Sequence, residues 1–413
     1  MAARDRLLPG RGHLLATGAS VFSSALTAAN AFAIAALAGS DSFGLFTVVI
    51  TVAGILGVPL LANVHFVLYQ ELPRADADER PTIVGSALAT GALFIAAGTA
   101  VFAACAPLLS ILSGLSHEDS LLSVLVAACL STMILTEAVL RGSRRLVTLL
   151  TIKTVIAAVT LAITLWMLLD GVRDPQPFLL VVSATALAFA VAAVIASPIR
   201  HPRWSTETAR RILRLGALLT LSSALTTIVF GADSLMLNLW ATPHEVGVYA
   251  LYNGFPKRLL GVVVTEGAGL VLLPLLAVSN TRTLLRRMLK LTPLIAAATA
   301  AVSFAASATV FWFLRAEYPY DIALFVLAAI GIAIHTVFNL FFFILSMDGV
   351  RGSRAFAYIM LAGTPLVLAT QAIAISGWQL EGALVAFILT NLLLVVLVIL
   401  VARHRYRDPK ATS

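Results

Sequence analysis

The sequence predicts an all-α integral membrane protein with twelve transmembrane helices in two six-helix lobes, related by a pseudo-twofold axis along the membrane normal. Composition is the first observation behind this prediction, because 60% of the 413 residues are hydrophobic and only 12% are charged. A soluble chain of this size needs a more polar exterior. The other two observations are twelve apolar segments of spanning length and the alternation of basic residues between them.

Each apolar segment is long enough to cross a hydrocarbon core about 30 Å thick. We place the segments at residues 14–38, 45–69, 82–110, 120–140, 147–169, 178–198, 214–239, 247–278, 289–314, 322–347, 355–375 and 381–402. The first follows several arginines and looks like a signal peptide. Its apolar stretch is longer than a typical signal-peptide core, so we expect a retained helix.

The distribution of basic residues predicts the topology. Of the 28 Lys and Arg, 23 lie in the two tails, in alternate gaps or in their immediate flanks. The gaps on the other side hold only Arg173 and Arg315. The positive-inside rule then places both termini in the cytoplasm. Because the basic residues follow membrane topology and form no single basic face, we expect no nucleic-acid partner.

An internal repeat predicts the two lobes. The motif at 23–27 in the first segment recurs at 222–226 in the seventh, and 43–46 is matched by 246–249 at a similar offset. Both matches fall at equivalent topological positions, which indicates two halves of the same orientation. We therefore expect an N-terminal lobe at 1–198, a cytoplasmic amphipathic linker at 199–213 and a C-terminal lobe with a short cytoplasmic tail at 214–413.

Two adjacent cations in the eighth segment are the main candidates for a binding site. Lys257 and Arg258 lie about a dozen residues inside the membrane, roughly 18 Å deep. Charges at that depth cost a few kcal/mol each and normally face a wet cavity or a partner. They could bind an anionic substrate, or form an ion pair with Asp233 that braces two helices. Pro256 just before them predicts a bend in the helix.

Further polar residues within the predicted spans are candidates of lesser weight. Asn253 belongs to the same run as the cation pair, and Glu266 suits cation or proton coupling unless it stays permanently neutral. Asn30 and His335 could contact substrate, although such residues more often form hydrogen bonds between helices. For Lys153, in the fifth segment, we expect a side chain that reaches back to the cytoplasm.

Missing motifs narrow the function. The chain has no phosphate-binding loop, no HExxH, no CxxC and no carboxylate-rich loop, so we expect no ATP hydrolysis, no metal site and no cofactor. The gaps on the outer side are too short to hold a catalytic loop. A transporter needs only a few polar groups at mid-depth between two halves, so the sequence favours transport over an enzyme.

Several motifs resemble those of polysaccharide flippases, the Wzx-type members of the multidrug/oligosaccharidyl-lipid/polysaccharide exporter superfamily. The segments at 231–237 and 245–252 look like the signature that joins the seventh and eighth helices of that family. The segment at 42–46 is similar to its first hairpin, and that at 139–145 to its turn between the fourth and fifth helices. The resemblance extends over the whole chain, including the helix count and the short loops.

This resemblance implies a transporter of the bacterial cytoplasmic membrane that flips an undecaprenyl-diphosphate-linked oligosaccharide from the inner to the outer leaflet for surface polysaccharide assembly. Lys257 or Arg258 would be the cavity cation. Expected partners are the lipid-linked glycan, membrane lipids, and the glycan polymerase and glycosyltransferases of the pathway. Lipid II flippases also carry arginines in the first helix, and this chain has none between His13 and Asp41, which argues against lipid II as cargo.

Three other functions are weighed against flipping. A cation-coupled multidrug exporter of the same superfamily would use Asp233 or Glu266, but no acid lies between Asp41 and Glu71 to make an acidic N-terminal cavity. A major-facilitator transporter would carry a Gly- and Arg-rich loop between its second and third helices, which is absent. A membrane-embedded glycan polymerase or acyltransferase would need a longer outer loop.

Overall fold

The computed structural model describes residues 11–261, 281–314, 317–346 and 349–405, and every regular element within these ranges is a helix. The chain divides into two compact units, a first unit of residues 1–227 and a second unit of residues 228–413. Among the described residues, ten helices are long and apolar enough to cross a membrane. The all-α membrane fold predicted from composition is confirmed.

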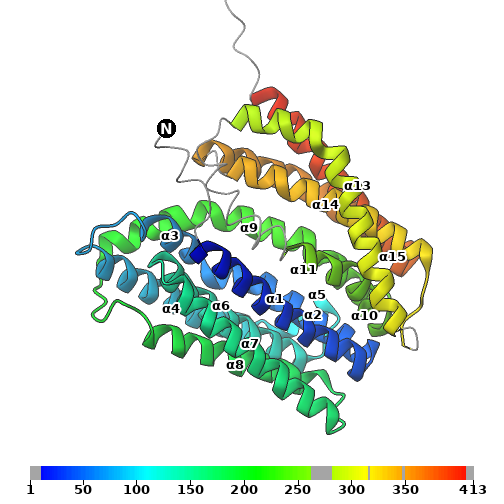
Figure 1. The fold of residues 1–413 in the computed structure, drawn as a ribbon, viewed down its shortest axis with the longest axis horizontal. Helices are drawn as coiled ribbons and strands as arrows, with labels where there is room; N and C mark the ends of the chain where they lie inside the picture. Colours follow the sequence, from blue (N-terminus) through cyan, green and yellow to red (C-terminus); the bar gives the residue numbers. More distant parts are fainter. Residues whose placement is uncertain (1–10, 262–280, 315–316, 347–348, 406–413) are drawn as a thin grey trace, which may run out of the picture. The chain divides into compact units, whose positions relative to one another are not determined.

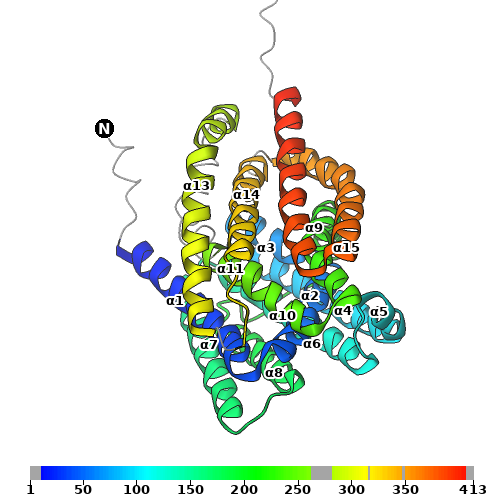
Figure 2. The same cartoon turned by 90° about the vertical axis from the view of Figure 1, so that its right-hand side faces the viewer.

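The first unit is a bundle of antiparallel helices joined by short turns (Figures 1 and 2). Its members are α1 (Arg11–Ala38), α2 (Ser40–Leu61), α3 (Val64–Glu71), α4 (Arg80–Ala104), α5 (Ala106–Ser113), α6 (His117–Gly142), α7 (Leu146–Leu169), α8 (Pro175–Ile195) and the start of α9 (Thr206–Trp240). In this unit α1 packs on α7, and α6 packs on both α2 and α8. The central position of α6 explains why so many of its polar residues are buried.

Two predicted spans of the first unit are each divided into two helices. The segment expected at 45–69 breaks between α2 and α3, where Ala62 and Asn63 both have positive φ angles of 43° and 52°. Asn tolerates this left-handed conformation better than other residues, and its amide donates to Thr220 Oγ1 at 3.2 Å. The segment expected at 82–110 breaks at Cys105, between α4 and α5.

The segment expected to be a surface linker, residues 199–213, is partly non-helical and partly the start of α9 in the structure. Residues 197–205 are mostly non-helical, and α9 then runs for 35 residues without interruption. The basic stretch at 206–213 is therefore the first two turns of α9, where Ile212 is buried and Arg211 forms an ion pair with Glu71 at 3.0 Å. The boundary between the two compact units falls inside the same helix, after Thr227.

The second unit holds the rest of the described helices, and residues 262–278 of the span expected at 247–278 lie outside the described residues. It comprises the end of α9, α10 (Pro243–Tyr249), a π-helical turn η1 (Ala250–Gly254), α11 (Phe255–Gly261), α13 (Thr281–Leu314), α14 (Ile322–Ser346) and α15 (Gly349–Arg405). α15 holds both spans expected at 355–375 and 381–402, because the backbone reverses at Gln379 with φ 44° and ψ −115°. A Cβ on Gly382 would lie 2.1 Å from the Ala374 carbonyl oxygen, so the last hairpin requires glycine there.

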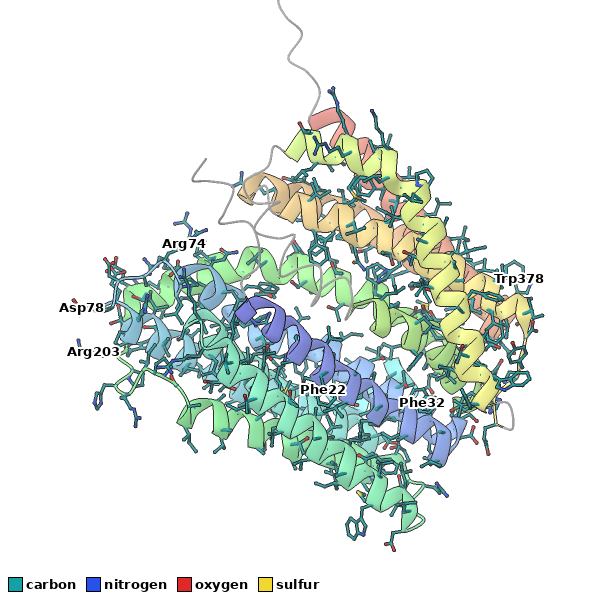
Figure 3. The ribbon with its side chains drawn as sticks, in the orientation of Figure 1. Phe22, Phe32, Arg74, Asp78, Arg203 and Trp378 are labelled. Carbon is teal, nitrogen blue, oxygen red and sulfur yellow. The ribbon has the colours of Figure 1, made fainter. Side chains whose placement is uncertain are left out.

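Apolar side chains cover the outer flanks of the helices, as contact with lipid requires. Phe22 on α1 and Trp378 on α15, both labelled in Figure 3, are examples of large apolar side chains that are exposed. Charged residues gather instead at helix ends, and Figure 3 places Arg74, Asp78 and Arg203 together at one end of the first unit. The first unit thus has a polar end next to apolar helix flanks, as expected of a membrane protein.

The predicted topology can be tested by cysteine labelling at positions 117 and 244. In a background in which Cys105 and Cys129 are replaced by alanine, His117→Cys and His244→Cys should react with a membrane-impermeant maleimide applied from outside, because the charge pattern puts both on the outer side. Arg144→Cys is the control and should react only after permeabilisation. The reverse labelling pattern would invert the topology.

Candidate functional site

The second unit contains a buried acid with a defined set of donors. Asp233 on α9 is fully buried. The Tyr249 hydroxyl donates to its Oδ2 at 2.5 Å, and the Ser234 backbone N–H donates to its Oδ1 at 2.7 Å. The Asn253 amide in turn donates to the Tyr249 oxygen at 2.6 Å. Buried carboxylates need such donors, and this chain of hydrogen bonds links α9 to the eighth predicted span.

The π-helical turn η1 positions this network. Pro256 has no backbone N–H, and its ring would clash with the carbonyl four residues back in a regular helix. The helical turn here contains one extra residue. As a result, the Phe255 N–H donates to the carbonyl of Ala250, five residues earlier. Tyr249 immediately precedes this turn and Asn253 lies within it, and the side chains of the two residues are hydrogen-bonded to each other. The bend predicted from Pro256 therefore takes the form of a π turn.

Lys257 belongs to a second cluster of polar and aromatic residues in the same unit, together with Phe387, His335 and Asn391. It is half-buried, and its Nζ lies 4.2 Å from the centroid of the Phe387 ring, a cation–π contact. The ring of His335 on α14 packs against Phe387 at 5.4 Å, and His335 Nδ1 lies 2.9 Å from Asn391 Oδ1. Lys257 and His335 thus both contact the Phe387 side chain.

The first unit has its own buried charge cluster. Glu137 on α6 is the common partner of Arg141, at 2.7 Å, and of Lys153 on α7, at 3.1 Å. The side chain of Glu137 is 9% exposed, that of Lys153 25% and that of Arg141 47%. The Lys153 side chain, which was expected to reach back to the cytoplasm, contacts Glu137, five residues before the end of α6.

A cavity of about 190 Å³ lies next to this cluster and is lined by α1, α6, α7 and α8. Its lining includes Lys153 and the polar side chains Ser23, Thr27, Asn30, Thr160 and Thr185. Asn30 Oδ1 is buried and accepts no hydrogen bond among the described residues. The cavity therefore offers one ammonium group and several hydroxyl and amide groups in an otherwise apolar bundle, a typical composition for a ligand site.

The structure distributes the candidate residues from the sequence over three places. Asp233 and Asn253 share the Tyr249 network, Lys257 and His335 share Phe387, and Asn30 lines the cavity of the first unit. The side chain of Arg258 and all of Glu266 lie outside the described residues. Sequence reasoning did not select Tyr249, Phe387 or Asn391. Asn391 was detectable as an asparagine within an apolar span.

The comparisons with known proteins identify the fold. Neither a protein-family model nor a curated protein sequence matches the chain. Among solved structures, it is similar to an inward-facing multidrug resistance MATE family transporter of the MOP superfamily, with a TM-score of 0.70, 14% identity, and 95% of this chain and 96% of that chain covered. It is also similar to the lipid II flippase MurJ in an inward closed conformation, with a TM-score of 0.62, 12% identity, and 94% and 87% covered.

A third similar structure is a MOP superfamily transporter from Pyrococcus furiosus whose binding pocket is described as having reverse polarity. Its TM-score is 0.56 with 11% identity, and 95% of each chain is covered. All three matches extend over nearly the whole chain at low identity, so what they share with it is the fold. The chain has the twelve-helix, two-lobe fold of MOP superfamily transporters.

Proposed function

We propose that this protein is a transporter that moves an undecaprenyl-diphosphate-linked oligosaccharide from the inner to the outer leaflet for surface polysaccharide assembly. The observation that carries this proposal is the partly buried ammonium group of Lys153, which lines the cavity of the first unit. A cationic side chain in the wall of a cavity favours an anionic cargo. The hydroxyl and amide groups of the lining suit the sugar part.

Lys257 supplies the corresponding cation in the second unit. Its ammonium group lies 4.2 Å from the centroid of the Phe387 ring, in a cation–π contact. A diphosphate carries its charge on several oxygens and gains from a point charge of this kind in a low-dielectric interior. In this proposal Lys153 and Lys257 each attract the diphosphate within their own lobe, and the surrounding polar groups replace part of its hydration.

Cation-coupled export of drugs is the second candidate, and the burial of Asp233 favours it. An acid deep in the membrane can couple transport to Na⁺ or protons if it exchanges partners. Here the carboxylate already accepts hydrogen bonds from Tyr249 and Ser234, which would have to be released on each cycle. The two candidates therefore differ in whether an anion binds Lys257 or a cation binds Asp233.

Reconstitution tests the proposal directly. In liposomes that contain the purified protein, a fluorescent lipid-linked diphosphate oligosaccharide should cross the bilayer faster than in protein-free liposomes, as measured with an impermeant quencher. A cell that lacks the protein should accumulate the lipid-linked glycan on the cytoplasmic leaflet. Flipping that does not exceed the protein-free rate, together with gradient-driven uptake of a cationic dye, would reject the proposal in favour of drug export.

A further inference from the structure

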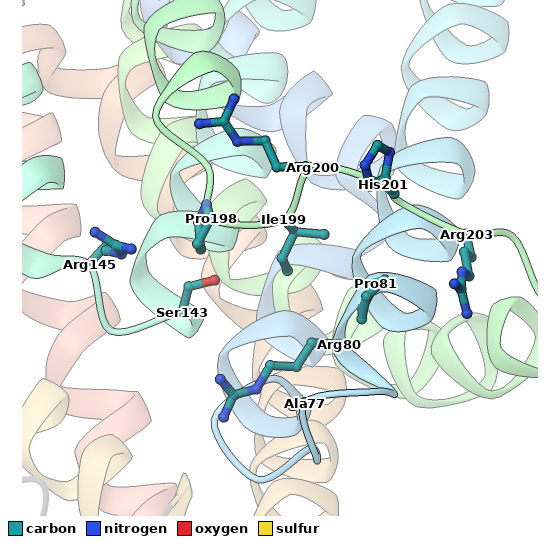
Figure 4. A pocket seen from close by; sticks show the side chains of 10 residues that line it. All are labelled: Ala77, Arg80, Pro81, Ser143, Arg145, Pro198, Ile199, Arg200, His201 and Arg203. Atoms are coloured by element: carbon teal, nitrogen blue, oxygen red, sulfur yellow. The ribbon is translucent and has the colours of Figure 1, made fainter.

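A second cavity lies at the end of the first unit where the predicted cytoplasmic turns gather. Its volume is about 490 Å³. It is bounded by three segments that are distant in sequence: the start of α4, the turn between α6 and α7, and the stretch after α8 (Figure 4). The side chains that line it are those of Ala77, Arg80, Pro81, Ser143, Arg145, Pro198, Ile199, Arg200, His201 and Arg203.

The stretch after α8 is fixed onto α4 by backbone contacts. The Arg203 N–H donates to the Pro81 carbonyl at 2.9 Å, and the Ser205 N–H donates to Ser86 Oγ at 3.0 Å. A Cβ on Gly85 would lie 2.3 Å from the Arg203 carbonyl oxygen, so only glycine permits this approach. These contacts hold the wall of the cavity in a defined geometry although the segment lacks helical structure.

The charge on the lining is entirely positive. Four arginines and one histidine surround the cavity, and no carboxylate is among the lining residues. The acidic residues of the preceding loop, Asp76, Asp78 and Glu79, lie outside the lining. Within the described part of the chain, none of the four arginines forms an ion pair. Ser143 Oγ is buried and has no hydrogen-bond partner among those residues, which leaves one hydroxyl available at the cavity wall.

Neighbouring apolar residues place the cavity at the edge of the membrane. Val147 follows Arg145 by two residues and is 76% exposed, and Ile195, just before the lining stretch, is 75% exposed. Trp204, next to Arg203, is also exposed, and exposed tryptophans are typical of the membrane interface. Arg145 and Arg203 therefore lie one or two residues from exposed apolar side chains, as expected for arginines at the depth of lipid headgroups.

We propose that this cavity binds the phosphate group of an anionic lipid in the adjoining leaflet. Guanidinium groups pair with phosphate oxygens in a forked geometry, and several from different segments can share one phosphate. Free phosphate or diphosphate has the same recognition chemistry, but the apolar flank favours a ligand with an acyl tail. This site lies apart from the Glu137 cluster and does not depend on which cargo the protein carries.

Binding of short-chain phosphatidylglycerol to the purified full-length protein in neutral detergent tests this proposal. The double variant Arg145→Gln/Arg200→Gln should bind the lipid roughly tenfold or more weakly, because each arginine contributes on the order of a factor of five to anionic-lipid binding. The matched control is Arg144→Gln/Arg210→Gln, which removes the same charge from exposed positions that do not line the cavity. It should bind almost as the wild type does.

Competition separates the sources of phosphate. Inorganic phosphate and pyrophosphate should displace the lipid only weakly, and phosphatidylcholine of the same chain length should not bind. Equal losses in the two double variants would show a diffuse surface effect and overturn the proposal, as would full displacement by free phosphate. If the cavity double variant is not monodisperse, Arg200→Gln alone, in the non-helical stretch, replaces it and should lose binding about fivefold.

Discussion

Replacing Glu137 with glutamine is expected to destabilise the protein by about 3 kcal/mol, the largest effect of any single polar substitution proposed here. The substitution keeps the shape of the side chain but removes the charge that both Arg141 and Lys153 contact. Lys153, only 25% exposed, is then a partly buried cation without a counter-ion. The value lies at the lower end of the usual range because Arg141 can turn toward solvent. Equilibrium unfolding in mixed micelles measures the free energy.

Two comparison variants locate the origin of this effect. Arg141→Gln should cost less than about 1 kcal/mol, because Arg141 is half-exposed and Lys153 still pairs with Glu137. The double variant Glu137→Gln/Lys153→Gln should recover much of the lost stability, since no uncompensated charge is left between α6 and α7. If Glu137→Gln alone leaves the unfolding free energy unchanged, the cluster is not a structural ion pair.

Hydropathy predicted the spans well because their length and composition reflect the bilayer itself. The span expected at 120–140 appears as α6, His117–Gly142, and that expected at 178–198 as α8, Pro175–Ile195. The ends were predicted less well, although local signals for them exist. Ser116 caps α6 by accepting from the Asp119 N–H, and Asp174 caps α8 immediately before a proline.

The internal breaks could not be predicted from hydropathy, because a window average is insensitive to backbone angles. Ala62 adopts a left-handed conformation that alanine disfavours by roughly 1–2 kcal/mol, so tertiary packing must impose it. The break at Gln379 similarly follows from the tight approach of Gly382 to Ala374. Proline is a local signal for two of the deviations. Pro107 lies in the first turn of α5, directly after the break at Cys105, and Pro256 identifies a helix that deviates, although it does not specify a π turn.

The candidate site was partly predictable from depth alone. A cation at the depth of Lys257 had to face the interior or a partner, and the structure places it against Phe387. The direction in which the Lys153 side chain points depends on its contact with Glu137, across the interface between α6 and α7. Counting inward from the turn between α6 and α7 would have placed Glu137 and Lys153 at similar depth, five and seven residues from the ends of their helices. This similarity in depth could have predicted the ion pair between Glu137 and Lys153 from the sequence.

Lys257→Gln is expected to reduce flipping of the lipid-linked oligosaccharide roughly tenfold to a hundredfold, because a charge-assisted hydrogen bond contributes about 1.5–3 kcal/mol. Lys257→Arg should retain most activity, since it keeps the charge near the Phe387 ring. The initial flipping rate in liposomes, normalised to the amount of folded protein, measures the effect. Phe387→Leu serves as the packing control and should reduce the rate much less, because it leaves the cation in place.

A double substitution separates substrate binding from the bracing of one helix against another. If Lys257 serves only to neutralise Asp233, then Asp233→Asn/Lys257→Gln removes both charges and should restore stability and transport together. In the binding hypothesis the double variant folds but still does not transport, because no group replaces the attraction for phosphate. We expect the second result. Asparagine keeps one acceptor oxygen, which can serve Tyr249 or the Ser234 N–H but not both, so Asp233→Asn should by itself cost about 1–3 kcal/mol of stability. Full transport by the folded double variant would therefore remove Lys257 from the binding site.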